Sequence, residues 1–389
     1  MASTEPAGGT GQDPAARDLY PAARLAAAAA ATSAAGLDAL LLTPGPDLRY
    51  VTGYAAHQLE RLTCLVLPGP DAAGHAAGPV LLVPSPELPA AQASPAGGLG
   101  LEIIGWDETD DPYALVAARL PGAAAVGLSD RMWALMVLRL RAALPGARQE
   151  LASLALRDLR ARKTPPEVAA LRAAGEAIDR VHARVPGWLR PGRTELEVAA
   201  DIGDAIIEEG HAQVDFAIVA SGPNAASPHH APAGRVLRPG DAVVVDIGGT
   251  MPSGYCSDCT RTYVIGPPPP DFAEYYRVLQ AAQEAACAAV RPGVAAEAVD
   301  AAAREPIAEA GYGAYFMHRT GHGIGLESHE DPYIVSGNRD PLQAGNAFSI
   351  EPGIYPGPHG ARIEDIVVCT EQGCERLNNG SRDLIVVDA

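Results

Sequence analysis

The chain has 389 residues, 48% of them hydrophobic and 20% charged, and is therefore long and apolar enough for two globular domains. Its formal net charge of -18 argues against nucleic acid and anionic membrane surfaces as partners, because both attract positive charge. Six cysteines in a chain of this size do not indicate a disulfide scaffold, so we expect a reducing, cytoplasmic location.

The N-terminal region begins with a segment, residues 1–17, that is rich in Gly, Pro, Ala and Thr and lacks apolar periodicity. We expect a disordered tail there and no signal peptide, because the segment lacks a basic start followed by an apolar core. The Ala-rich run 25–35 is too short to span a membrane and is flanked by Arg24 and Asp38, which favours a soluble helix.

Residues 18–151 alternate short apolar strands with helices, a pattern that predicts a separate α/β domain. The strand candidates are 38–43, 62–67, 79–84, 101–106 and 124–129, and the helix candidates are 112–120 and 131–144. We expect a linker at 152–166 and a second domain at 167–389. Thr164 and Pro165 predict the N-cap and first turn of its opening helix.

Residues 242–262 form an apolar, β-branched strand, a Pro/Ser/Gly turn and a second strand, which together predict a hairpin. If the hairpin is regular, its centre falls at Pro252, and Asp246 and Asp258 lie directly opposite each other on one face. Two buried acids so placed repel each other, and a neighbouring cation would neutralise them. The hairpin therefore predicts a metal site.

A second hairpin, at residues 346–370, repeats this design. Its centre falls between Gly357 and Pro358, which would place Glu351 opposite Glu364 on one face. The two predicted hairpins together supply four carboxylates.

The segment between the two hairpins, HRTGHGIGLESHE, supplies His322 in a glycine-rich bend where backbone and ligand can approach closely. Four carboxylates and one imidazole form an oxygen-rich set that is sufficient for two divalent ions if some carboxylates bridge. Such a set suits Mn, Co, Zn or Fe better than a thiolate-type zinc site.

An internal repeat is visible in the second domain without any comparison. Matching residues lie 100 to 106 positions apart and in the same order, as one duplication with an insertion would produce. The pairs are Arg190-Pro191-Gly192 with Arg291-Pro292-Gly293, Phe216 with Phe316, His229 with His329, Asp246 with Glu351, and Asp258 with Glu364. Each half would contribute helices and then a ligand-bearing hairpin, with the site between the halves.

Five ordered blocks, DIGG, GYCSDCTRT, GHGIGLESHE, SIEPGIY and RIED, resemble the metal-dependent peptidases of the pita-bread fold. This is the aminopeptidase P and prolidase family, peptidase family M24, which also contains methionine aminopeptidase. The resemblance extends from about Lys163 to the C-terminus. It implies an α+β fold with a pita-bread catalytic domain that has an internal pseudo-two-fold repeat. The preceding domain resembles the smaller creatinase-like α/β domain of aminopeptidase P and prolidase.

By position, the resemblance implies two divalent metal ions per subunit, with Mn as the first choice and Co, Zn or Fe as alternatives. It makes Asp258 and Glu364 bridging ligands. The implied ligands are Asp246, Asp258, His322, Glu351 and Glu364. Asp246 and Asp258 lie 12 positions apart, one more than in many relatives, and an extra turn residue would absorb this difference.

The remaining implied roles concern proton transfer and substrate placement. Glu351 would carry the proton from water to the leaving nitrogen. His229, favoured over its neighbour His230, and His329 would stabilise the tetrahedral intermediate or place the substrate. His318 and Arg362 match positions that orient substrate or ligands.

The resemblance implies an Xaa-Pro aminopeptidase, with Xaa-Pro dipeptidase (prolidase) as the alternative. Its substrate would be a peptide with proline at the second position, and its quaternary state a homodimer. The large N-terminal domain argues against a methionine aminopeptidase. The complete ligand set argues against a metal-free creatinase-like hydrolase and against a non-catalytic binding module.

Overall fold

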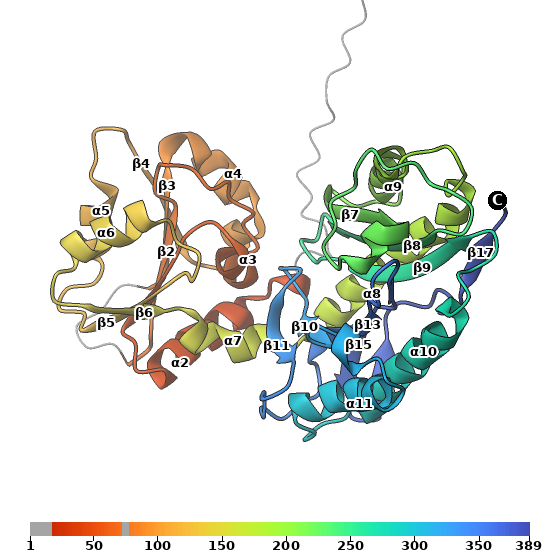
Figure 1. Cartoon of the computed structure of the whole chain (residues 1–389). Helices are drawn as coiled ribbons and strands as arrows, with labels where there is room; N and C mark the ends of the chain where they lie inside the picture. The colour runs from red at the N-terminus through yellow and green to blue at the C-terminus, as the bar shows by residue number, and fades with distance from the viewer. Residues whose placement is uncertain (1–17, 72–77) are drawn as a thin grey trace, which may run out of the picture. The chain divides into compact units, whose positions relative to one another are not determined.

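The computed structural model describes residues 18–71 and 78–389 (Figure 1). The tail expected at 1–17 lies outside the described residues. The chain divides into two compact units, of which the first ends at Leu159 and the second is Arg160–Ala389. Within the two described ranges, no helix is long and apolar enough to cross a membrane.

The first unit is built on a six-stranded mixed sheet with the strand order β4-β3-β2-β1-β5-β6. β2 pairs antiparallel with β1 and β3, whereas the outer pairs are parallel. The strands are β1 (Ala39–Leu42), β2 (Cys64–Pro68), β3 (Val80–Pro84), β4 (Glu102–Trp106), β5 (Ala125–Leu128) and β6 (Arg148–Leu151). The first five confirm the predicted strands. β6 was missed because its sequence, RQEL, has no apolar run.

In the sequence of the first unit, helices precede, separate and follow these strands. They are α2 (Ala22–Ala34), α3 (Pro46–Thr52), α4 (Leu88–Ala93), α5 (Pro112–Ala118), α6 (Ala134–Ala143) and α7 (Ser153–Ala161), with short 3-10 turns at Ser85–Glu87 and Pro95–Gly98. α2 confirms the helix expected from the Ala-rich run, and α5 and α6 confirm the two helix candidates. α7 lies within the expected linker 152–166, so much of that stretch is helical.

The second unit contains four long helices and three small sheets (Figure 1). Its helices are α8 (Pro165–Arg184), α9 (Glu195–Glu208), α10 (Phe272–Ala289) and α11 (Ala296–Glu309), with 3-10 turns at Val185–Gly187, Gly222–Ala226 and Gly313–Tyr315. α8 begins as predicted, because the backbone N–H of Thr164 donates to the Glu167 carboxylate at 2.8 Å in a capping box.

Two of the sheets carry the predicted hairpins. One has the strand order β17-β9-β8-β7 and the other β11-β10-β12-β15-β16, while β13 and β14 form a separate pair. Their bounds are β7 (Gln213–Ser221), β8 (Ala242–Thr250), β9 (Cys259–Ile265), β10 (Gly321–Gly323), β11 (Glu330–Ile334), β12 (Ala347–Ile350), β13 (Gly353–Ile354), β14 (Ala361–Arg362), β15 (Asp365–Thr370), β16 (Gly373–Arg376) and β17 (Ile385–Val387).

The internal repeat is visible in backbone contacts. In the first half, the N–H of Gly192 donates to the Leu237 carbonyl at 3.1 Å, just before α9. In the second half, the N–H of Gly293 donates to the Leu342 carbonyl at 2.8 Å, just before α11. Each half also has its own apolar core, one built by α8, α9 and β7 to β9 and the other by α10, α11, β12 and β15. The duplicated architecture predicted from sequence is therefore confirmed.

Candidate metal centre

The first hairpin places two aspartates on one face. β8 pairs with β9 so that Asp246 faces Thr260, and the same register puts Asp258 across from Gly248. The hairpin therefore turns one residue later than Pro252, and the prediction that the two aspartates lie directly opposite each other is wrong. A shift of two positions in pairing preserves the face, whereas a shift of one would reverse it. The later turn thus leaves both carboxylates on the same side.

The second hairpin has the predicted register. Ile350 of β12 faces Asp365 of β15, and β13 pairs with β14 in the same register beyond them. Glu351 and Glu364 consequently lie directly opposite each other, as the sequence predicts. A bridge between Thr260 and Glu364 joins this hairpin to the first one. All four acids are brought together by these pairings.

His322 enters the site from β10 with its ring buried. Its Nδ1 lies 3.2 Å from the Gly323 carbonyl, which fixes the proton on that nitrogen. Its Nε2 lies 3.3 Å from Glu351 Oε1 and 3.7 Å from Asp258 Oδ2. Burial, followed by the adjacent His329, lowers the pKa of His322 to about 3, so the ring is neutral. Its free nitrogen lone pair therefore faces carboxylate oxygens.

Three of the carboxyl groups are destabilised as anions. Burial is the largest cause, and it raises the pKa of Glu351 to about 7. Burial, reinforced by the neighbouring carboxylates, raises the pKa of Asp258 and of Glu364 well above the ordinary range. A charge cluster of this kind has a high free energy unless a cation neutralises it.

The hydrogen bonds among the described residues do not satisfy two buried carboxylate oxygens of the cluster. Asp246 Oδ1 and Glu364 Oε1 have no hydrogen-bond partner in the part of the chain that the structure describes. The second oxygen of each side chain is used, since Asp246 Oδ2 accepts from Arg362 at 2.6 Å and Glu364 Oε2 accepts from Thr260 at 2.7 Å. Buried polar atoms are normally satisfied, so these two oxygens point to a missing positive ligand.

The donor atoms are also close enough to share ions. Three groups have one donor atom from each member within 4.8 Å of the others: Asp258–His322–His329, His322–Glu351–Glu364 and Asp246–Asp258–Glu364. Asp258 and Glu364 each belong to two of these groups. Carboxylate oxygens with one or two imidazole nitrogens are ligands that Mn, Co, Zn and Fe accept. The residues therefore fit divalent metal ions.

A pocket of about 410 Å³ opens onto this cluster. The sequence-predicted residues that line it include His229, His318, His329 and Arg362 as well as the five acid and imidazole side chains above. His318 Nε2 lies 2.9 Å from the Tyr355 hydroxyl, and burial, followed by Arg362, lowers the pKa of His318 to about 4. Every predicted site residue is therefore in or beside one pocket.

The pocket also has walls that the sequence reasoning did not identify. Phe216 and Ile218 of β7 supply an apolar wall, and Arg319 supplies a cation. Phe216 had been noted only as part of the repeat, although alternation along β7 places it on the same face as Ile218. A Cβ at Gly248 would lie 2.6 Å from the Phe216 ring, so the first glycine of DIGG makes room for this wall.

The loop that carries His229 is fixed by a buried carboxylate outside the pocket. Glu195, fully buried at the start of α9, accepts from the Ser221 hydroxyl at 2.6 Å and from the Asn224 amide at 3.0 Å. His230 Nε2 lies 2.9 Å from the same carboxylate. His230 is thus held by Glu195, while its neighbour His229 lines the pocket.

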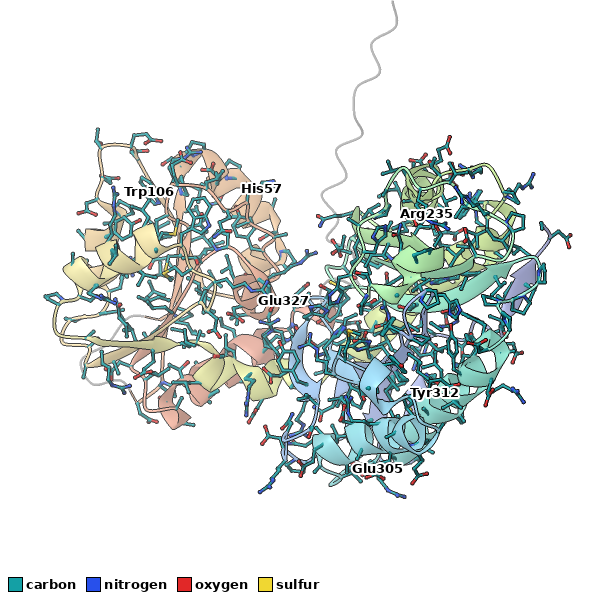
Figure 2. All side chains as sticks on the ribbon, viewed as in Figure 1. His57, Trp106, Arg235, Glu305, Tyr312 and Glu327 are labelled. Atoms are coloured by element: carbon teal, nitrogen blue, oxygen red, sulfur yellow. The ribbon has the colours of Figure 1, made fainter. Side chains whose placement is uncertain are left out.

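A second contact holds the same loop through Arg235, which is labelled in Figure 2. Its guanidinium donates to the Ser221 hydroxyl at 2.6 Å and to Asp241 at 2.6 Å. The segment between Ser221 and Arg235 is therefore held at both ends.

The Glu195→Gln variant is expected to lose about 1.5–3 kcal/mol of unfolding free energy, because the amide cannot accept all these hydrogen bonds. Burial alone would raise the pKa of Glu195, but hydrogen bonds from Ser221, Asn224 and His230 lower it overall. A lowered pKa contributes stability above the ordinary glutamate pKa that is lost as pH falls. Urea unfolding of chelated protein at neutral and acidic pH should show a smaller acid-induced loss in the variant.

The control for this experiment is Asp204→Asn, which changes an exposed carboxylate on the same helix. If the Glu195 and Asp204 variants were equally stable at neutral pH, the buried network would have no special role.

The chain is similar to known proteins over nearly its whole length. Metallopeptidase family M24 matches residues 169–371, and the Creatinase/Prolidase N-terminal domain matches residues 24–162. A protein of Mycobacterium bovis named "Probable dipeptidase PepE" is 57% identical, over 94% of this chain and 96% of its own length. An "Xaa-Pro dipeptidase" of Lactobacillus delbrueckii subsp. lactis is 36% identical, over 90% of this chain and 95% of its own.

A solved structure agrees with these matches. The crystal structure of dipeptidase PepE from Mycobacterium ulcerans has a TM-score of 0.89 and 56% identity, and covers 97% of this chain and 100% of that one. The family match spans more than half of the chain, and its residues include the whole acid and imidazole cluster. The predicted α+β fold and the resemblance are confirmed. The chain belongs to metallopeptidase family M24.

Proposed function

We propose that this chain is a metal-dependent exopeptidase that hydrolyses the bond between an N-terminal residue and a following proline. The observation that carries the proposal is the buried cluster of four carboxylates and one imidazole that faces a pocket with an apolar wall. Phe216 and Ile218 offer a proline ring a surface that requires no hydrogen bond.

We assign two divalent ions to the cluster, with Asp258 and Glu364 shared between them. Asp258 and Glu364 each belong to two donor groups, as His322 also does, but a carboxylate has two oxygens to offer whereas the imidazole has one free nitrogen. The ligands would be Asp246, Asp258, His322, Glu351 and Glu364, with manganese as the first candidate and Co, Zn or Fe as alternatives. When bound, such ions supply positive charge that activates a water molecule and polarises a peptide carbonyl.

The protein side chains have separate tasks in this proposal. Glu351 is the proton carrier, because it is half-buried whereas Glu364 is fully buried. Ser349 donates to Glu351 Oε1 at 3.1 Å, which leaves Oε2 to take a proton from water and deliver it to the leaving nitrogen. His229 and His329 line the pocket, where they donate hydrogen bonds to the developing oxyanion or position the peptide.

His318 and Arg362 orient the other groups. Tyr355 connects them, since its hydroxyl lies 2.9 Å from His318 Nε2 and 3.0 Å from Arg362. Arg362 in turn holds Asp246, so it acts on the site through that carboxylate. His318 lines the pocket and is the member of this chain of contacts that would bind substrate.

The dipeptidase form of the activity has specific support. The relatives named above at 57% and 36% identity are called dipeptidases, and this favours Xaa-Pro dipeptides over longer peptides. A homodimer, a cytoplasmic location and the domain limits 18–151 and 167–389 stay predictions from the sequence.

The test is hydrolysis of Ala-Pro and Ala-Pro-Ala by the purified full chain, before chelation, after chelation and after single metals are restored. We expect chelation to abolish release of alanine and one divalent metal to restore it. The ratio of the hydrolysis rates of Ala-Pro and Ala-Pro-Ala distinguishes a dipeptidase from an aminopeptidase P.

Ala-Ala and Met-Ala-Ser serve as controls for proline dependence and for methionine aminopeptidase activity. Cleavage of the controls without cleavage of either proline peptide would contradict the proposed specificity. A protein that binds no metal and cleaves none of the peptides would contradict the peptidase assignment itself.

A further inference from the structure

Two cysteines contribute to the apolar core built by α10, α11, β12 and β15. Cys287 lies on α10 and Cys374 on β16, and both are free thiols. Their side chains are close enough to interact directly with each other. The two positions are distant in sequence, so the fold itself creates this pair.

The two thiols face a cavity that is separate from the metal pocket. Its volume is about 400 Å³, and it shares no lining residue with the pocket at the metal cluster. Its walls carry two arginines, Arg291 and Arg376, and two glutamates, Glu284 and Glu371, and Cys374, which also lines it, is half-buried. The cavity is large enough for a small organic molecule.

The surroundings shift the pKa values of the two thiols in opposite directions. The interaction with Cys287 is the largest cause that lowers the pKa of Cys374, and Arg376 lowers it further, against burial, Asp365 and Glu284, which raise it. The same interaction and burial raise the pKa of Cys287. Cys374 is therefore the thiol that ionises and attacks, and Cys287 is the protonated partner beside it.

We propose that Cys287 and Cys374 form a dithiol site that reduces hydroperoxides and is itself oxidised to a disulfide. The Cys374 thiolate attacks the peroxide, the O–O bond breaks, and the alcohol or water that leaves takes up the proton lost by Cys374. Cys374 becomes a sulfenic acid. The Cys287 sulfur then attacks the Cys374 sulfur and displaces hydroxide, which takes the Cys287 proton and leaves as water. Two thiols and one hydroperoxide give one disulfide, one alcohol and one water.

A third cysteine provides an internal comparison. Cys369 faces Cys374 across the β15–β16 hairpin and is fully buried. Burial raises the pKa of Cys369 to about 11, so it stays protonated. Cys369 does not line the cavity that Cys287 and Cys374 share, and this makes Cys287 the resolving thiol.

The test treats the purified full chain with equimolar hydrogen peroxide, followed by alkylation in denaturant and peptide mass mapping. We expect a Cys287–Cys374 linked peptide that disappears after reduction. Cys374→Ser should lose the disulfide. Cys287→Ser should accumulate a sulfenic acid at Cys374 that dimedone traps. Cys369→Ser should form the disulfide as the wild type does.

A second reagent tests the pairing without oxidation or substitution. Phenylarsine oxide bridges two neighbouring thiols, and peptide mapping of the wild-type adduct should locate it at Cys287 and Cys374. The proposal would be overturned by a disulfide between Cys369 and Cys374, or by oxidation of Cys374 no faster than that of the buried, solitary Cys64. Peptidase activity is not the readout, so failure of this proposal leaves the proposed function untouched.

Discussion

The Asp258→Asn variant is expected to lose peptidase activity, with kcat/KM lowered by about 10³-fold or more. Asp258 contributes an oxygen to two of the three donor groups, so its loss weakens both ion positions at once. Several kcal/mol of transition-state charge stabilisation depend on the bound ions, and about 1.4 kcal/mol corresponds to a tenfold change in rate. Metal content after dialysis should fall together with activity.

The same substitution is expected to stabilise the metal-free protein. Burial and the charges of Glu364 and Asp246 raise the pKa of Asp258, so the folded state resists its ionisation. A carboxyl whose folded-state pKa is raised makes the folded protein bind more protons than the unfolded chain, and stability then falls as pH rises above the ordinary aspartate range. Asparagine removes this cost. The chelated variant should therefore melt at a higher temperature than the chelated wild type at pH 8.

The control is Asp204→Asn, which changes an exposed aspartate on α9. It should leave metal content, activity and both melting temperatures close to those of the wild type. An Asp258→Asn variant that bound metal normally, or that was less stable than the wild type after chelation, would contradict the description of the cluster as a cation site.

The local pattern of the chain predicted most of the architecture. Short apolar runs located five of the six strands in the first unit, and the acids within apolar strands of the second unit located the cluster. The exact register of the first hairpin was not predictable, because the length of its turn is set by local packing and not by strand pattern. The outcome for the site was unaffected, since Asp258 moved by two positions and kept its face.

The sequence pattern did not reveal the buried polar contacts outside the metal cluster, for a different reason. Glu195 reads in the sequence as an ordinary acid at a helix start, and its partners Ser221 and His230 lie 26 and 35 positions away. The Cys287–Cys374 contact likewise depends on the packing of α10 against β16. Long-range contacts between single polar side chains leave no periodic signal.

Arg362→Met is expected to lower the unfolding free energy of the chelated protein by about 3–5 kcal/mol, because it leaves a buried charge without its partner. Arg362 is 2% exposed and joins four segments of the second unit. Its guanidinium donates to Asp246 at 2.6 Å, to the Tyr355 hydroxyl at 3.0 Å, and to the Thr260 hydroxyl and Pro228 carbonyl at 3.1 Å each. Urea unfolding measures the loss.

Two further variants separate the charge of Arg362 from its geometry. Arg362→Lys keeps the charge but cannot reach all four acceptors with one ammonium, so its stability should lie between those of the wild type and Arg362→Met. Combining Arg362→Met with Asp246→Asn removes both charges, and the double variant should be more stable than the sum of the two single effects predicts, by about 0.5–3 kcal/mol. Strict additivity in this cycle would show that Arg362 contributes through packing alone. A non-additive result would establish that the cation holds Asp246 in place, and with it one end of the metal centre.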